Sequence, residues 1–270
     1  MILVFDVGNT ELTIGLFNDQ VLRAHWRIMT DVARTPDEFG VLLRQLLAAS
    51  DFSPEVVEGV AIGSVVPPVT APLAEACSRY FGVGKPVVVD ARAGLPIQLD
   101  VDEPMTVGAD RLINTLAASR LYHTDAIVVD MGTATTFDCI TADGVFLGGV
   151  IAPGVRTSAE TLTRRTSKLP ATELTLPGNV IGKRTEECIR AGVMYGAADS
   201  IDGMVRRIKA VWPRPETPVV IATGGFAELI APICATVDRV EPYLTLQGLQ
   251  IAHSLLAGGT HPLQPAGFSR

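Results

Sequence analysis

Short apolar runs separated by polar turns open the chain. Apolar residues dominate positions 2–5, 13–17 and 21–28, and a turn rich in small polar residues, at 6–10, follows the first run. Asn18-Asp19 forms a second turn between the second and third runs. This pattern predicts a three-stranded meander.

A helix start follows the meander. Thr35 is a typical N-cap residue, and Pro36 is favoured at the first helical position. Glu38 completes a capping box with Thr35. Leucines continue from there at helical spacing. After this helix, the distribution of apolar and polar residues predicts a strand at 60–62, a helix near 71–80 and a strand at 86–89.

The pattern then begins again. The apolar run at 126–129 ends in Asp130-Met131-Gly132, as the first run ends in Asp6-Val7-Gly8, 124 residues earlier. The same offset places Asn18-Asp19 on Ala142-Asp143, which indicates an internal duplication. The other predicted elements are helices at 110–122, 158–168, 185–211 and 245–256 and strands at 137–140, 145–151 and 218–222.

Two such halves predict an α/β protein with two mixed sheets flanked by helices. We place the halves at 1–122 and 123–257, with a cleft between them at the carboxyl ends of the strands. Residues 258–270 are rich in Gly and Pro without periodicity, which predicts a mobile tail.

Composition excludes several classes of protein. Hydrophobic residues make up 47% of the chain, enough for buried cores, so global disorder is excluded. The net charge of −7 argues against nucleic acid as the main ligand. The four cysteines lie far apart without metal spacing, and we expect neither a signal peptide nor a membrane span. A cytoplasmic protein is the expectation.

The two Asp-x-Gly turns carry the first candidate chemistry. Glycine allows close approach of a phosphate, Thr and Asn donate hydrogen bonds, and an Asp at a strand end suits a metal ion. One copy could be ordinary hairpin chemistry, but two copies at matching positions of a repeat favour phosphate binding. The layout resembles that of actin-like ATPases and sugar kinases. Thr223-Gly224-Gly225 fits the adenosine turn of that superfamily, or any strand-to-helix turn.

A more specific resemblance comes from three segments read together: Asp6-Val7-Gly8-Asn9-Thr10, Val107-Gly108-Ala109-Asp110-Arg111 and the run from Asp130 to Thr136. They are similar to the motifs of type III pantothenate kinases, and the likeness extends over residues 1 to about 256. It implies a duplicated actin-like ATPase (ribonuclease H-like) fold. It also implies ATP-dependent phosphorylation of pantothenate to 4′-phosphopantothenate, the first step of coenzyme A biosynthesis.

The resemblance also implies roles for individual residues. Asp110 would be the catalytic base, although it could instead cap the following helix and pair with Arg111. Gly108, Ala109, Asp110 and Arg111 would bind pantothenate. The turn residues Asp6, Val7, Gly8, Asn9, Thr10, Glu11, Leu12 and Thr13, with Thr133 from the second half, would face ATP and Mg²⁺. Asp6 and Asp130 are the candidate metal ligands, and Asp130 would bind a monovalent cation, K⁺ or NH₄⁺.

Thr185 resembles a threonine that reaches the substrate from the partner subunit of a homodimer, so the active site would lie at or near the subunit interface. It could also be a helix N-cap. The chain departs from the family at Val101, where a substrate-contacting Tyr is frequent, and at Glu11 and Arg184. Val101 donates no hydrogen bond, which leaves the shape of the substrate pocket open.

Two alternatives remain at this stage. One is a kinase of the same superfamily that acts on another small hydroxylated substrate. The other is a non-catalytic regulatory factor, against which the retention of Asp6, Asp110 and Asp130 argues.

Overall fold

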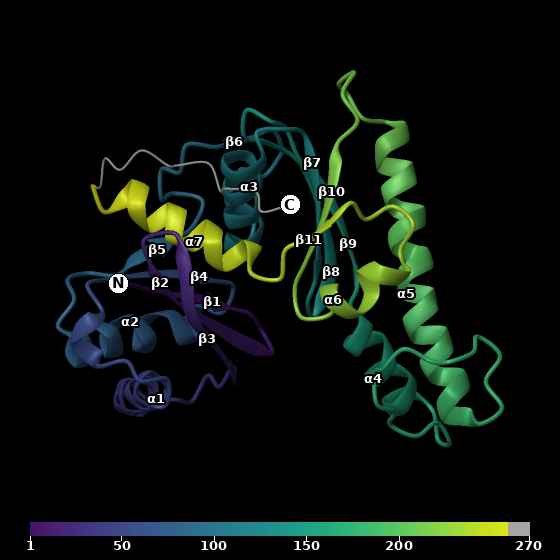
Figure 1. Cartoon of the computed structure of the whole chain (residues 1–270), viewed down its shortest axis with the longest axis horizontal. Helices are drawn as coiled ribbons and strands as arrows, with labels where there is room; N and C mark the ends of the chain where they lie inside the picture. Colours follow the sequence, from purple (N-terminus) through teal and green to yellow (C-terminus); the bar gives the residue numbers. More distant parts are fainter. Residues whose placement is uncertain (259–270) are drawn as a thin grey trace. The chain divides into compact units, whose positions relative to one another are not determined.

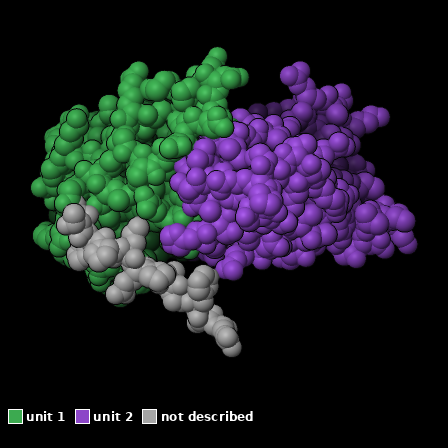
Figure 2. All heavy atoms as spheres, turned by 90° about the horizontal axis from the view of Figure 1, so that it is seen from above, with its two compact units in different colours: residues 1–121, 244–270 green, residues 122–243 purple. Residues whose placement is uncertain are grey.

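The computed structural model describes residues 1–258 and divides into two compact units (Figures 1 and 2). The first holds residues 1–121 and the segment from Leu244 onward, and the second holds residues 122–243. The tail predicted at 258–270 lies outside the described residues except for Gly258. No helix in the described part of the chain has the length and apolar character that a membrane crossing requires.

The first unit contains a sheet in the order β3-β2-β1-β4-β5. Its strands are β1 (Ile2–Val7), β2 (Glu11–Asn18), β3 (Val21–Met29), β4 (Gly59–Ser64) and β5 (Val87–Val89). The meander β1-β2-β3 is antiparallel, as predicted, while β4 runs parallel to β1. The helices of this unit are α1 (Pro36–Ala48), α2 (Pro67–Phe81), α3 (Ala109–Tyr122, of which Tyr122 is counted with the second unit) and α7 (Leu244–Leu256).

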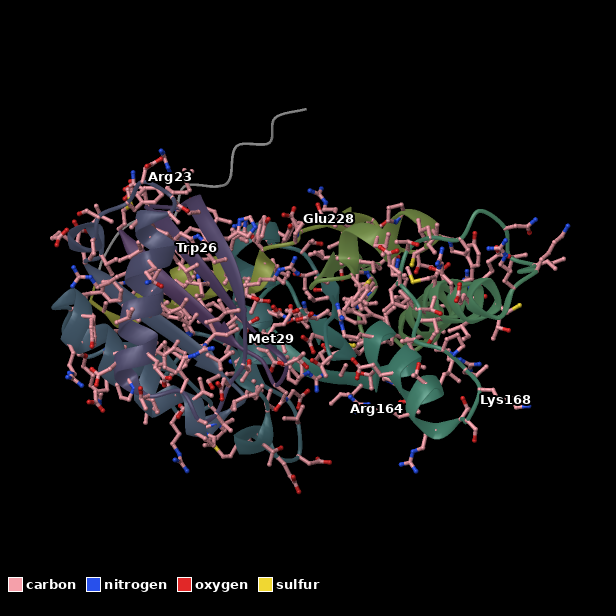
Figure 3. The ribbon with its side chains drawn as sticks, turned by 90° about the horizontal axis from the view of Figure 1, so that it is seen from below. Arg23, Trp26, Met29, Arg164, Lys168 and Glu228 are labelled. Atoms are coloured by element: carbon pink, nitrogen blue, oxygen red, sulfur yellow. The ribbon has the colours of Figure 1, made fainter. Side chains whose placement is uncertain are left out.

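Alternation along β3 shows how this edge strand faces both the core and solvent. Arg23 and Met29 are exposed, whereas Trp26 packs against the core and donates from Nε1 to Ser50 Oγ at 3.2 Å (Figure 3). The inward residues of β1 and β2 meet α1 and α2 in one apolar cluster that includes Phe5, Phe39 and Leu73. The alternation along β3 therefore reflects a buried face and an exposed one, whereas the apolar runs that predicted β1 and β2 are buried along most of their length.

In the second unit the strands run in the order β11-β10-β7-β8-β9. Their bounds are β7 (Ala126–Met131), β8 (Ala134–Ile140), β9 (Val145–Pro153), β10 (Val219–Thr223) and β11 (Arg239–Val240). The helices are α4 (Val155–Arg165), α5 (Thr185–Ala210) and α6 (Ala227–Ile230). The remaining short elements of the chain are β6 (Gln98–Leu99) and the 3₁₀ turns η1 (Pro54–Val56), η2 (Pro104–Thr106) and η3 (Ala231–Ile233).

The two sheets repeat one topology. Asp6 at the end of β1 is paired with Thr13 of β2 and Gly63 of β4. Asp130 at the end of β7 is paired with Thr136 of β8 and Thr223 of β10. The second hairpin is therefore one residue shorter than the first, but each Asp occupies the same place in its sheet.

Helix α7 requires a correction to the predicted domain boundaries. We predicted halves at 1–122 and 123–257, with the last helix in the second half, but α7 packs on β1 and β4 of the first unit. A side chain added at Gly15 would meet Leu246, and one at Gly63 would meet Leu249. The chain thus returns to its first unit after completing the second.

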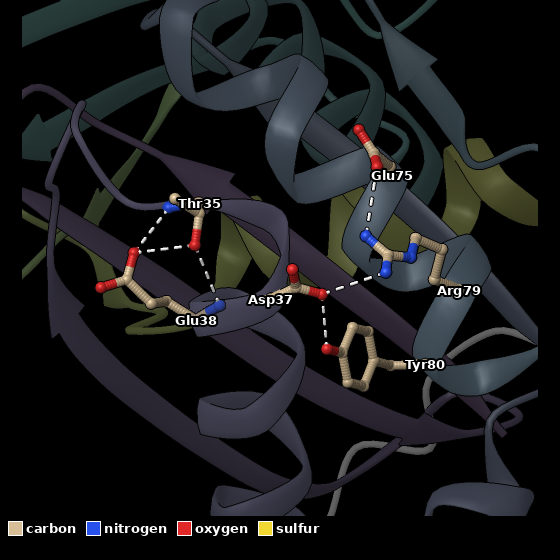
Figure 4. Close-up of polar contacts among 6 residues, drawn as sticks. All are labelled: Thr35, Asp37, Glu38, Glu75, Arg79 and Tyr80. Atoms are coloured by element: carbon tan, nitrogen blue, oxygen red, sulfur yellow. Dashed lines mark hydrogen bonds and ion pairs between the residues drawn. The ribbon is translucent and has the colours of Figure 1, made fainter.

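Helix α1 begins at the predicted capping box. Thr35 Oγ1 accepts a hydrogen bond from Glu38 N at 3.3 Å, and the Glu38 carboxylate accepts one from Thr35 N at 2.7 Å (Figure 4). Within the same first turn, Asp37 accepts a hydrogen bond from Tyr80 Oη at 2.6 Å and lies 3.2 Å from Arg79 of α2 (Figure 4). The start of α1 is thereby fixed both locally and to α2.

We expect Thr35→Ala to lower the free energy of unfolding by about 1 kcal/mol, because it leaves orphan N–H groups at the start of α1 without their acceptor. Urea denaturation measures the change. Thr35→Ser, which keeps the acceptor, is the matched control and should lose much less. Equal losses for the two variants would show that the methyl group rather than the cap is responsible.

Candidate active site

The first candidate segment is the turn between β1 and β2. Gly8 N donates to Glu11 O at 3.0 Å, which closes the turn. A side chain on Gly8 would lie 3.1 Å from the same carbonyl oxygen, so the turn favours glycine. Thr30, directly after β3, holds the turn from outside: its N donates to Thr10 O at 3.0 Å and its Oγ1 to Gly8 O at 2.6 Å.

The segment before α3 lies at the same end of the first sheet. Because β1 and β4 are parallel, their carboxyl ends share one edge, and Val65 N donates to Val7 O at 3.1 Å there. A side chain on Gly108 would meet Val65 at 3.5 Å. The structure therefore brings the Asp6 turn and the start of α3 to one edge of this unit.

Asp110 is the second residue of α3 and is partly buried. Gly108 O accepts the first hydrogen bonds of the helix, from Arg111 N at 3.1 Å and Leu112 N at 3.2 Å, so Gly108 rather than Asp110 occupies the cap position. Asp110 is therefore not the N-cap residue of α3. Its Oδ1 does accept a hydrogen bond from Arg111 N at 2.9 Å, so the association with Arg111 is real.

The environment of Asp110 alters its acidity. Burial raises the pKa of the Asp110 carboxyl above its usual range, although the backbone N–H and positive charge of Arg111 offset part of the effect. A Cβ on Gly108 would collide with Asp110 Oδ1. Because Gly108 has no side chain, the Asp110 carboxylate can occupy the space beside it. Val101 lies between β6 and η2, partly buried, and offers only an apolar side chain.

The second unit contains the matching turn between β7 and β8. Gly132 N donates to Ala134 O at 3.0 Å, as Gly8 does to Glu11 in the first unit. Thr133 O accepts two hydrogen bonds, from Gly154 N at 3.2 Å and from Thr157 Oγ1 at 2.6 Å. The turn is therefore fixed by Gly154, between β9 and α4, and by Thr157 in the first turn of α4.

The Gly224 turn packs directly on Asp130. Gly224 has φ of +89°, and a Cβ there would collide with Asp130 Oδ1 and lie 2.7 Å from Met131 N. Phe226 N donates to Met131 O at 3.3 Å. The predicted Thr223-Gly224-Gly225 turn thus lies against the predicted cation ligand, because β10 runs parallel beside β7.

A cavity of about 480 Å³ in the same unit is lined by residues of α4, residues 171–174, Ile189 and Phe226. The Arg156 guanidinium lies 5.7 Å from the centre of the Phe226 ring. Since Phe226 also bonds to Met131, the cavity adjoins the turn that follows β7.

Thr185 is the first residue of α5, the helix that also contributes Ile189 to the cavity. Arg184 occupies the N-cap position and makes no capping bond with its side chain, so the N-cap alternative for Thr185 is wrong. The Thr185 side chain is exposed.

No group of three or more His, Cys, Asp or Glu in the described part of the chain could hold a metal ion by itself. Asp6 and Asp130 are single carboxylates at strand ends. Mg²⁺ in kinases is commonly held by one or two carboxylates together with substrate phosphates and water. The residues present therefore fit a Mg²⁺ ion that arrives with the nucleotide, and they do not form a self-sufficient metal site.

Sequence reasoning missed the residues that hold the two turns, Thr30, Gly154 and Thr157. An exposed or partly buried threonine has many ordinary uses, and the bonds join segments about 20 residues apart. The offset of 124 places Thr30 on Gly154, whose N–H also holds a turn, but it does not lead to Thr157.

Comparison with known proteins agrees with this geometry. The family model described as type III pantothenate kinase matches residues 2–207. A type III pantothenate kinase of Anaeromyxobacter sp. (strain K) is 46% identical over 255 residues, which cover 94% of this chain and 98% of that protein. One from Anaeromyxobacter dehalogenans (strain 2CP-C) is equally similar, with the same coverage.

Solved structures share the fold at low identity. A protein from Campylobacter jejuni assigned to the Baf family of transcriptional activators is 17% identical, with a TM-score of 0.57 over 94% of this chain and 98% of that one. Component A of the (R)-2-hydroxyglutaryl-CoA dehydratase of Acidaminococcus fermentans is 12% identical, with a TM-score of 0.54 over 95% and 98%. These likenesses confirm the predicted fold class, an actin-like ATPase fold with two mixed sheets. From the family model and the close relatives, the chain belongs to the type III pantothenate kinases.

Proposed function

We propose that this member of the type III pantothenate kinases transfers the γ-phosphoryl group of ATP to the primary hydroxyl of pantothenate with Asp110 as the general base. One observation supports this assignment most: a partly buried carboxylate with a raised pKa lies at the same sheet edge as a phosphate-type turn. Phosphoryl transfer requires little more than positioning, charge stabilisation and a group that accepts the proton.

Asp110 acts on the attacking hydroxyl. A neutral hydroxyl is a weak nucleophile, and a carboxylate within hydrogen-bond reach accepts its proton as the bond to phosphorus forms. Because burial raises its pKa, the Asp110 carboxylate is a stronger base than an exposed aspartate. Gly108, Ala109 and Arg111 bind pantothenate around it, and the guanidinium of Arg111 suits the carboxylate of that substrate.

The phosphates are assigned to the two turns. In the first unit, residues 6–13 include a glycine, an asparagine and two threonines, which would face the phosphates. In the second unit, the hydroxyl of Thr133 has the same role. Asp6 would hold Mg²⁺ together with phosphate oxygens, and Asp130 would hold K⁺ or NH₄⁺. Bound cations neutralise the charge that develops on the transferred group. The cavity beside Phe226 is the proposed place for adenosine, since aromatic and cationic side chains suit a nucleobase.

We further propose a homodimer in which Thr185 reaches the pantothenate of the partner subunit. Its exposure at the start of α5 supports this role, since an exposed hydroxyl is available to another molecule. A cytoplasmic location also belongs to the proposal, in keeping with four cysteines that form no disulfide.

The test of this function is ADP release with and without pantothenate, in the presence of Mg²⁺, with K⁺ and then Na⁺ as the monovalent cation. We expect release that depends on pantothenate and is faster in K⁺. A panel of sugars and other small hydroxy acids serves as the control, because the apolar side chain of Val101 leaves the shape of the substrate pocket open. Faster turnover of another substrate would contradict the assignment of pantothenate.

We expect Gly108→Ala to lower kcat about tenfold to a hundredfold, because the new methyl group takes the space of Asp110 Oδ1 and turns the carboxylate away. The free energy of unfolding should change little, since Gly108 does not have a positive φ. Steady-state kinetics and thermal unfolding measure the two quantities. An unchanged kcat would show that displacement of the Asp110 carboxylate does not impair catalysis.

A further inference from the structure

Each phosphate-type turn is held by a threonine hydroxyl at nearly the same distance. In the first unit, Thr30 Oγ1 donates to Gly8 O at 2.6 Å. In the second unit, Thr157 Oγ1 donates to Thr133 O, also at 2.6 Å. Both threonines follow the third strand of their meander, β3 or β9, and each turn also accepts a backbone N–H from that segment, from Thr30 itself or from Gly154.

The two threonines are not equivalent in the sequence repeat. Thr30 directly follows β3, whereas Thr157 lies in the first turn of α4, and the offset of 124 residues places Thr30 on Gly154 instead. The acceptors differ as well, because the same offset places Gly8 on Gly132 and not on Thr133. What the two units share is a threonine hydroxyl bound to a carbonyl oxygen of the turn. The two hairpins differ in length by one residue, and their threonines are not equivalent in the repeat. A threonine hydroxyl bound to each turn therefore indicates that the turn requires this support, and not that both units inherited one residue through the duplication.

The bond determines where the peptide groups of the turn point. In a trans peptide the C=O and N–H groups point in opposite directions, and this chain has no cis peptide bond among its described residues. Fixing Gly8 O toward Thr30 therefore directs the N–H of Asn9 the other way. Fixing Thr133 O toward Thr157 likewise directs the N–H of Ala134 away from α4. Backbone N–H groups arranged in this way bind the oxygens of phosphate.

We propose that Thr30 and Thr157 are positioning residues for ATP: their hydroxyls hold the two turns in the conformation whose N–H groups receive phosphate oxygens. This inference rests on the proposed function in one respect, namely that the nucleotide is ATP. Neither threonine is assigned a contact with substrate, and neither takes part in the transfer itself. Their effect is on the affinity for nucleotide, because a turn that is already ordered pays less entropy on binding.

The other explanation for these bonds is structural. Both side chains are partly buried and neither belongs to an apolar core cluster. The neighbouring elements have other means of support, since β3 is paired along β2 and α4 packs on α5. Loss of one hydroxyl should therefore affect the turn more than the fold.

The test measures the dissociation constant of Mg²⁺-ATP by isothermal titration calorimetry on the full chain. The variants are Thr30→Val and Thr157→Val, which keep the shape of the side chain, and Thr30→Ser and Thr157→Ser, which keep the hydroxyl. We expect each Val variant to bind ATP roughly fivefold to tenfold more weakly, as for the loss of one hydrogen bond. Each Ser variant should bind nearly as the wild type does. The double Val variant should show the product of the two effects, because the bonds lie in different units.

A matched control separates the role of the turns from the general loss of a threonine hydroxyl. Thr166 Oγ1 donates to Leu162 O at 2.7 Å at the end of α4, away from either turn. Thr166→Val should leave ATP affinity unchanged. Thermal unfolding of all variants with and without ATP shows whether a loss of affinity reflects a loss of fold.

Several results would overturn the inference. They are unchanged ATP affinity in the Val variants, equal losses in the Val and Ser variants, or a melting temperature that falls while affinity holds. Absence of ATP binding by the wild type would also overturn it. Failure of the proposed function is a different result, namely binding of ATP without phosphorylation of pantothenate, and in that case the affinity comparison still decides the role of the two threonines.

Discussion

Replacing Asp110 with asparagine is expected to lower the turnover of pantothenate by about 10²- to 10⁴-fold, the usual contribution of a general base. Asparagine has nearly the same shape and can still accept the hydrogen bond of Arg111 N, but it cannot take a proton. The affinity for ATP should change little, because the nucleotide is assigned to other residues. Steady-state kinetics and ATP titration measure the two effects.

The same substitution should not destabilise the protein at neutral pH. Because burial raises the pKa of Asp110 in the folded state, the unfolded state loses this proton at lower pH than the folded state does. The group therefore contributes stability below its unfolded pKa, and that contribution is lost as the pH rises through its folded pKa. At pH 7 the charged form costs free energy in the folded protein, so Asp110→Asn should keep or raise the melting temperature.

The pH profile provides a further check on Asp110. As a base it must be ionised, so kcat/KM should fall on the acid side with an apparent pKa above the ordinary aspartate value of about 3.9. The residual activity of Asp110→Asn should lack this limb. An asparagine variant with wild-type turnover, or one that keeps the same acid limb, would contradict the role of Asp110 as base.

Gly224→Ala is expected to lower both stability and nucleotide binding. The residue has φ of +89°, which disfavours any side chain, and its Cβ would meet Asp130 Oδ1 and the backbone of Met131. Strain and overpacking together should cost about 2–4 kcal/mol. Since Asp130 and the turn after β7 must shift, we expect the KM for ATP to rise at least tenfold and the response to K⁺ to weaken.

Gly82→Ala is the matched control. Gly82 ends α2 with φ of +65°, but an added Cβ would meet no atom within 4 Å. It should therefore cost only about 1 kcal/mol and leave the KM for ATP unchanged. Unfolding in urea and steady-state kinetics compare the two variants. Equal effects of both on KM would show that general loss of stability, rather than displacement of Asp130, is responsible.

Local patterns predicted the strands and the ends that carry carboxylates. An apolar run that ends in Asp6 or Asp130 is visible without any knowledge of the fold, because a buried parallel strand must be apolar until it emerges. The capping box at Thr35 and Glu38 is equally local, and both of its hydrogen bonds are present. The very short elements β11 and α6 were not predicted, because a few residues give too little periodicity.

Long-range features were beyond the sequence. Nothing local shows that Leu246 of α7 meets the position of Gly15, which lies more than 200 residues earlier. Asp6 and Asp130 fall at matching places of the two sheets, as the repeat predicts, but the bonds of Thr30 and Thr157 depend on how the chain folds back. The buried Asp202 is a similar case, since it accepts hydrogen bonds from Ala235 N at 2.8 Å and Thr236 N at 2.9 Å and fixes a loop that no motif marks.

The measurement that tests the account most directly is identification of the reaction product. Purified protein is incubated with ATP, Mg²⁺, K⁺ and pantothenate, and the pantothenate is recovered and analysed by mass spectrometry and ³¹P NMR. The account predicts a gain of one phosphoryl group on the primary hydroxyl, formed together with ADP by the wild type and reduced at least a hundredfold in Asp110→Asn. Pantothenate recovered unchanged, or phosphopantothenate formed equally by both proteins, would contradict it.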